Sequence, residues 1–200
     1  MKKQAIIIIL SLILIVNLKA QNEIRNDNSS GFNIQMQLIS KNNTTFIGAF
    51  PGYTLNGQWD FGLGVGFQNH EDYNVEGISI YPWVEYMFLK QDDGNLPLSV
   101  ELGYQFSFTN FDKIQLNQST HSLYLAAYHS VALNDDFQII PGASFALHNT
   151  TIDLDSFRDV DTGFAYTIEV ALVMQKFWIR PYLRFFDRTN NIGFWVGYIF

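Results

Sequence analysis

The sequence predicts an all-β chain that closes into a transmembrane, up-and-down barrel of antiparallel strands. Three observations lead to this: apolar residues at every second position over most of the chain, connectors that alternate between short and long, and a last strand that ends on the aromatic residue Phe200. A period of two gives a strand two different faces. Only helices and closed barrels satisfy every backbone polar group in lipid, and beyond the first twenty residues no apolar run is long enough for a spanning helix.

The chain begins like a secretory signal peptide. Two lysines precede the apolar run Ala5–Val16, and Ala20 offers a small residue for cleavage. The run is shorter than the ~20 residues of a spanning helix. We therefore expect residues 1–20 to be a signal peptide, residues 21–30 a periplasmic N-terminal tail, and residues 31–200 one outer-membrane β-barrel domain.

Composition excludes several classes of function. Loss of the leader removes Lys2, Lys3 and Lys19, which leaves 9 basic and 19 acidic residues and a formal charge of −10. Nucleic-acid binding is disfavoured, because contacts with phosphates need lysine and arginine. The chain has no cysteine, so disulfides, thiol chemistry and lipid attachment at a cysteine are excluded.

Ten segments show the alternation of a strand, most of them long enough to cross a bilayer when tilted. They are Phe32–Ile39, Thr45–Leu55, Gln58–Gln68, Gly77–Leu89, Pro97–Phe108, Thr120–Leu133, Phe137–His148, Gly163–Met174, Phe177–Phe186 and Ile192–Phe200. Ten strands are favoured, and the first is expected to pair with the last. A count of eight stays open if the first two or the last two segments do not both cross the membrane.

The connectors predict which ends of the strands face which side. The short ones are Asn56-Gly57, a strong hairpin signal, Lys90–Leu96, Asn134–Asp136 and Gln175-Lys176. The longer polar ones are Asn69–Glu76, Thr109–Ser119 and Asn149–Thr162. Outer-membrane barrels have short periplasmic turns and longer outer loops. We therefore expect the short turns and both termini in the periplasm and the long segments outside, although Lys41–Thr44 and Asp187–Asn191 are short outer connectors.

Parity separates a lipid face from a lumen face. On the third segment Trp59, Phe61 and Leu63 oppose Asp60 and Gly62, and the apolar face of a barrel meets lipid. In a soluble secreted β-protein, the rival fold, the same face would be the core. The sixth segment is ambiguous, because an outward odd face with Leu123, Leu125, Val131 and Leu133 turns His129 to lipid, whereas Tyr124, Ala126 and Tyr128 offer an even face instead.

The predicted lumen face carries a charge network. Its members are Asp60, Glu85, Glu101, Glu169, Arg180 and Arg184. Unpaired buried charges are costly, so we expect these acids and arginines to pair and to plug the lumen, with Glu169 nearly opposite Arg180 and Glu85 close to Glu101. The alternative is a charged constriction in a narrow pore. Glycines at every second position from Gly62 to Gly66 leave room for neighbouring aromatic side chains, which favours a filled interior.

No spacing marks a catalytic or metal site. His70, His121 and His148 are expected near the outer rim, where Ser144, His148 and Asp153 are candidates for a hydrolase, but nothing identifies a nucleophile with its base. The acidic stretch Asp153–Asp161 lacks the glycine and closing glutamate of an EF-hand, so it is expected to be a solvated loop. We expect no enzymatic activity, no metal and no cofactor.

Several motifs resemble the small outer-membrane β-barrel protein family of Gram-negative bacteria (outer membrane protein beta-barrel domain). The matching stretches are Pro51-Gly52-Tyr53, Asn56-Gly57, Gly62–Gly66, Pro82–Tyr86, Leu102-Gly103-Tyr104 and Gly197–Phe200. The resemblance implies the fold, a multi-pass location in the outer membrane, no catalytic residues, and an insertion signal at Tyr198 and Phe200 that the barrel-assembly machinery recognises. Many members have eight strands, whereas ten are counted here.

The sequence thus predicts a monomeric integral outer-membrane protein with a largely filled lumen, in contact with membrane lipid. Its expected role is structural, or the binding of surface ligands or partners through outer loops. A narrow, porin-like passive pore for small solutes is the alternative, and an outer-membrane lipid hydrolase or protease comes third. The sequence does not identify the external ligand.

Overall fold

The computed structural model describes residues 30–41, 44–70, 75–91, 96–111, 116–134, 136–154, 157–186 and 190–200. The predicted signal peptide and nearly all of the predicted tail lie outside these residues. The strands are β1 (Gly31–Lys41), β2 (Thr44–Leu55), β3 (Trp59–His70), β4 (Val75–Leu89), β5 (Ser99–Phe111), β6 (Leu116–Tyr128), β7 (Val131–Asn134), β8 (Phe137–Leu154), β9 (Phe157–Met174), β10 (Phe177–Phe186) and β11 (Asn190–Ile199). No helix with the length and apolarity to cross a membrane occurs in the described residues.

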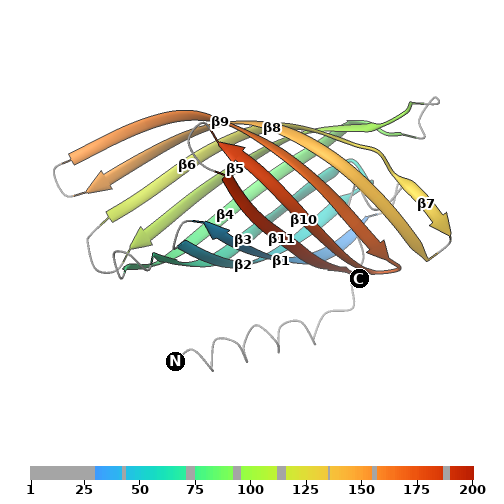
Figure 1. Cartoon of the computed structure of the whole chain (residues 1–200), viewed down its shortest axis with the longest axis horizontal. Helices are drawn as coiled ribbons and strands as arrows, with labels where there is room; N and C mark the ends of the chain where they lie inside the picture. Colours follow the sequence, from blue (N-terminus) through green and yellow to red (C-terminus); the bar gives the residue numbers. More distant parts are fainter. Residues whose placement is uncertain are drawn as a thin grey trace, which may run out of the picture.

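The strands form one closed antiparallel barrel (Figure 1). Strands that are neighbours in sequence pair with each other except for β6 and β7, β1 pairs with β11, and β6 pairs with β8. β6 and β7 both pair with β8 and follow one another along it, so together they make one interrupted strand. The barrel therefore has ten strands, which confirms the predicted fold and strand number and sets aside the count of eight.

The interruption between β6 and β7 explains the ambiguous sixth segment. The backbone N–H of His129 donates to the carbonyl oxygen of Pro141 (3.0 Å), and its ring Nδ1 lies 2.6 Å from the carbonyl oxygen of Pro97. Leu123 is 49% exposed and Tyr128 only 7%, so the odd-numbered side chains of β6 point outward and the even-numbered ones inward. The odd-numbered face of the sixth segment is therefore the outward one. His129 lies at the break between β6 and β7 rather than in a regular lipid-facing position.

The short turns gather at the end of the barrel that carries the C-terminus (Figure 1). We call this the short-turn end, and the opposite end the long-loop end. Asn56 and Gly57 have φ of 53° and 55°, as a two-residue hairpin turn with both central residues at positive φ requires. The Ile199 N–H donates to the Lys176 carbonyl (2.7 Å) and the Phe200 N–H to the Phe32 carbonyl (3.4 Å), which ties the chain end to its neighbours.

At the long-loop end the strands run further than the sequence predicts. The expected connector Asn149–Thr162 is wrong, because β8 continues to Leu154 and β9 begins at Phe157, with Thr150 paired to Asp161. Likewise β5 reaches Phe111 and β6 starts at Leu116, inside the expected connector Thr109–Ser119. Beyond the apolar belt both faces of a strand meet water, so the apolar alternation stops although the backbone pairing continues.

The outward side of the barrel is an apolar belt. Large exposed side chains repeat at alternate positions of the strands, for example Phe61, Leu63 and Val65 on β3 and Phe164, Tyr166 and Ile168 on β9. On a closed barrel these side chains have no protein partner to cover them. The inward side carries polar and small residues together with large aromatic ones such as Phe50 and Trp178.

Candidate functional site: the lumen and the outer extension

Two clusters of mostly apolar side chains lie inside the barrel, and together we call them the aromatic layer. One cluster consists of Phe46, Phe50 and Trp83, with Ile39 and Tyr81 packed on it. A second cluster lies around Trp178 and contains Ala126, Tyr128, Ile140, Ala171, Val173 and Ile199. Trp195 packs against both clusters, and its ring lies edge-on to that of Phe50 with 4.9 Å between centroids. Trp195 therefore connects the two clusters inside the barrel.

The glycines of β3 make room for this layer. A Cβ on Gly64 would lie 2.3 Å from a ring carbon of Phe50, and one on Gly66 would lie 2.2 Å from a ring carbon of Phe46. Any larger residue at these positions would displace a ring of the first cluster. This confirms the prediction that the alternating glycines leave room for neighbouring aromatic side chains.

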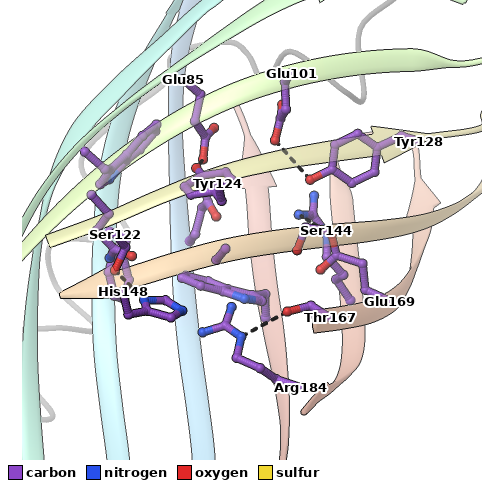
Figure 2. A pocket seen from close by; sticks show the side chains of 17 residues that line it. Glu85, Glu101, Ser122, Tyr124, Tyr128, Ser144, His148, Thr167, Glu169 and Arg184 are labelled. Carbon is purple, nitrogen blue, oxygen red and sulfur yellow. Dashed lines mark hydrogen bonds and ion pairs between the residues drawn. The ribbon is translucent and has the colours of Figure 1, made fainter. Parts of the chain in front are cut away.

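A polar cavity of about 120 Å³ borders Phe50, Trp83 and Trp195 of the layer. Figure 2 shows the side chains that line it. Its polar lining consists of Gln35, Glu85, Glu101, Gln105, Ser122, Tyr124, Tyr128, Ser144, His148, Thr167, Glu169, Arg180 and Arg184. A water molecule takes up about 30 Å³ of liquid volume, so a cavity of this size suits a few water molecules rather than a large ligand.

The arginines of β10 meet partners on β9. Arg180 Nη1 lies 3.9 Å from Glu169 Oε1, and both side chains are about nine-tenths buried. The guanidinium also lies over the ring of Trp178, 4.9 Å from its centroid. In the register Glu169 stands opposite Tyr182, so the ion pair is diagonal. Four residues further along β10, Arg184 stands opposite Thr167, and its Nε donates to Thr167 Oγ1 (3.0 Å).

The acids of β4 and β5 meet tyrosines of β6 (Figure 2). The Tyr124 hydroxyl donates to the Glu85 carboxylate, and the Tyr128 hydroxyl donates to Glu101 Oε1 (3.0 Å). The sequence did not identify either tyrosine as a hydrogen-bond partner of these acids. The signal that could have found them is the even-numbered face of the sixth segment, once it is placed inside. Tyr128 then lies one diagonal step from Glu101, and Tyr124 lies in line with Glu85 across Gly103 of β5.

Asp60 is the one predicted lumen charge that does not line the cavity. It is 1% exposed, stands opposite Glu85 in the register, and accepts hydrogen bonds from Thr54 Oγ1 (3.1 Å) and the Asn33 amide (3.5 Å). The structure thus places five of the six charged residues on one cavity and the sixth next to it, toward the short-turn end.

The histidines do not form the candidate hydrolase site. His148 lies inside the lumen, not at the rim, because β8 extends beyond it to Leu154. Its Nδ1 is 2.7 Å from Ser122 Oγ, and its buried Nε2 has no hydrogen-bond partner in the described residues. Ser144 lines the same cavity, but Asp153 is exposed and pairs with Arg158 (3.6 Å). The predicted trio is therefore not assembled.

The other predicted histidines lie elsewhere. His121 is exposed on the outward face, with Nδ1 2.6 Å from the Tyr104 hydroxyl, and the side chain of His70 lies outside the described set. Across the described part of the chain, no group of three or more histidine, aspartate or glutamate side chains is arranged to hold a metal ion.

A second feature lies at the long-loop end. The β8–β9 extension, residues 149–154 and 157–163, forms the tip of the hairpin farthest from the C-terminus (Figure 1). The outward side chains of β9 are apolar from Phe164 to Met174. In the extension the outward side chains are mostly polar, among them Asn149, Asp153 and Arg158. The extension therefore lies beyond the apolar belt.

No protein-family model matches this chain. No curated protein matches it either. Among solved structures, it resembles the β domain of the Bordetella autotransporter BrkA, at 12% identity and a TM-score of 0.55, over 86% of this chain and 82% of that one. It also resembles a bacterial polysaccharide outer-membrane secretin, at 9% identity and a TM-score of 0.50, over 88% of this chain and 66% of the secretin chain. These likenesses show the fold, that of an outer-membrane β-barrel.

Proposed function

We propose that this protein is a monomeric integral protein of the outer membrane with an occluded lumen, and that it meets external ligands or partners through the β8–β9 extension. The observation that carries the occlusion is the position of Trp195, packed between the two clusters of the aromatic layer. A barrel filled in this way would serve as a rigid support for the β8–β9 extension that projects from its rim.

The outward face supports residence in a bilayer. Leu63 on β3, Ile168 on β9 and Ile192 on β11 are each more than half exposed, and similar side chains surround the barrel. Leaving so much apolar surface in water would be unfavourable at roughly 25 cal/mol per Å², and a hydrocarbon environment removes that cost. The predicted export of the chain agrees with this location.

The two alternatives have weaker support. A passive pore needs an aqueous path, and the described side chains of the aromatic layer occupy the lumen. A hydrolase needs a base that is itself oriented by a third group, and the described partners of His148 are Ser122 and the ring of Phe186. No carboxylate stands among them.

Conductance tests the occlusion. The refolded protein, with its barrel verified by a heat-dependent shift on an SDS gel, would be inserted into a planar bilayer. We expect no stepwise current at neutral pH in potassium chloride. Regular current steps from the wild-type protein would overturn the occluded lumen and support the passive pore.

Labelling tests the outward position of the extension. The chain has no cysteine, so Thr162→Cys gives a single reactive site. A membrane-impermeant maleimide should label this variant on intact cells of a Gram-negative host, whereas the matched control Lys176→Cys, in a short turn, should be labelled only after the cells are broken. The reverse pattern would place the extension in the periplasm and contradict the proposed role.

A further inference from the structure

The extension leaves one edge of β9 without a neighbouring strand. β8 pairs with β9 along its whole length to Leu154 opposite Phe157. On the other side, the pairing of β10 with β9 ends at Phe186 opposite Ala165. In the described residues, the stretch from Phe157 to Phe164 therefore has a partner on one side only, an open edge of roughly 25 Å at ~3.3 Å per residue.

This edge lies in water rather than in lipid. The stretch contains Arg158, Asp159 and Asp161, and its residues 157–162 are all exposed. An unpaired edge inside the hydrocarbon would leave backbone groups without hydrogen bonds, whereas an edge beyond the apolar belt is solvated. The open edge is thus accessible to a partner from the aqueous side.

The backbone groups of Val160 face the open side. Its N–H donates to the carboxylate of its own neighbour, Asp159 Oδ1, at 3.0 Å. Backbone groups of alternate residues point to the same side of an antiparallel strand, so those of Arg158 and Thr162 face the open side as well. Charged side chains on an edge strand oppose indiscriminate pairing, and Asp159 here also occupies one edge donor.

The charge of the edge selects its partner. Arg158 is neutralised by Asp153 on β8, at 3.6 Å, whereas no ion pair of Asp159 or Asp161 occurs in the described residues. These two acids lie two residues apart and therefore on one face of the strand. A strand added beside them would place every second side chain next to a carboxylate.

We propose, resting on the outward position of the extension, that the open edge of β9 binds an extended basic segment of a partner protein by strand addition. The partner's backbone would take the hydrogen bonds that face outward from Val160 and its alternate neighbours, and would release the Asp159 carboxylate. Lysine or arginine at alternate positions of the partner would then pair with Asp159 and Asp161. Main-chain pairing supplies affinity in this mode, and the alternate side chains supply specificity.

A labelled peptide tests the proposal on the refolded full-length barrel. The probe is a fluorescein-labelled octapeptide with lysine at alternate positions and threonine or valine between them, and its binding is followed by fluorescence anisotropy in zwitterionic detergent. We expect saturable binding. One control peptide carries glutamate in place of lysine, and a second keeps the lysines but has N-methyl groups on alternate amides, which block one hydrogen-bonding edge.

Two variants locate the contact. Val160→Pro removes the outward-facing N–H while leaving the pairing with β8, and Val160→Ala is its matched control. We expect the proline variant to weaken binding of the lysine peptide by about tenfold or more and the alanine variant to bind like the wild type. The pair Asp159→Asn and Asp161→Asn should weaken it as well.

The outcomes are separable. Equal binding of the N-methylated peptide, or wild-type binding by Val160→Pro, would overturn strand addition and leave only charge attraction. Equal binding of the glutamate peptide would overturn the basic partner. If Val160→Pro does not show the heat-dependent gel shift, the N-methylated peptide on the wild-type protein decides alone. None of these results alters the conductance or the cell labelling, which test the proposed function separately.

Discussion

Trp195 and Phe50 meet edge to face inside the barrel, with 4.9 Å between ring centroids and 66° between ring planes. They come from β11 and β2, on either side of β1, so the contact spans the seam where the first strand meets the last. Since Trp195 also packs on the cluster around Trp178, this contact joins the two halves of the aromatic layer. The connection between the two clusters, on which the proposed occlusion rests, therefore depends on a residue of the last strand.

Trp195→Ala should open a path through the layer. The substitution removes the group shared by the two clusters, and we expect ion conductance in planar bilayers where the wild-type protein shows none. Trp195 is partly buried, so its truncation should also destabilise the barrel, by less than the about 3–5 kcal/mol of a fully buried tryptophan. The matched control is Phe194→Ala, which removes a neighbouring aromatic ring from the lipid side and should stay closed. A closed Trp195→Ala barrel would mean that another part of the lumen blocks the passage.

Glu169→Gln should destabilise the barrel. It removes the carboxylate that pairs with the guanidinium of Arg180, which is nine-tenths buried, and breaking a buried pair from one side costs about 3–5 kcal/mol. Unfolding in urea, followed by the unboiled gel band, measures the loss.

The exposed pair Arg158–Asp153 provides the control for that experiment. Its side chains are 71% and 51% exposed, so Arg158→Gln should cost about 0–1 kcal/mol. The double variant Glu169→Gln with Arg180→Met removes both buried charges and should regain much of the stability lost by the single variant. A double variant no more stable than Glu169→Gln would show that Arg180 matters through its stacking on Trp178 instead.

The sequence predicted the parts of the fold that a period of two determines. Strand number, the β1–β11 seam and the inward position of residues such as Glu101 all follow from parity and from the connectors. Contacts between strands, such as that of Tyr124 with Glu85 across Gly103 of β5, depend on the register between strands and on the break at His129, which no single-strand pattern encodes. The sequence predicts a loop where the β8–β9 extension lies, because apolar residues alternate only where one face of a strand meets lipid. Beyond the lipid the strands stay paired, but neither face needs to be apolar.

Gly57→Ala should weaken the turn between β2 and β3. Gly57 has φ of 55°, a left-handed conformation that costs an L-residue about 1–2 kcal/mol. We expect a loss of this size in urea unfolding. Asn56→Gly is the control, since glycine accepts the φ of 53° found at that position without strain. An unchanged Gly57→Ala midpoint would indicate that the turn relaxes to another type.

Deletion of Phe200 should impair insertion into the outer membrane. The Phe200 N–H donates to the Phe32 carbonyl at 3.4 Å, and its ring lies 4.8 Å from that of Tyr198, so the residue ends the last strand at the β1–β11 seam. Its loss removes both this hydrogen bond and the terminal aromatic side chain that the sequence predicts as part of the insertion signal. We expect less heat-shifted protein in the outer-membrane fraction.

Phe200→Tyr is the matched control for the deletion. It keeps the backbone N–H and an aromatic ring, so it should insert as the wild type does. Equal insertion of all three proteins would show that the seam closes without its last residue and that Tyr198 suffices as the aromatic signal. If the deletion and Phe200→Tyr lose insertion equally, insertion requires phenylalanine itself at this position. Tyrosine differs from it only by the added hydroxyl group.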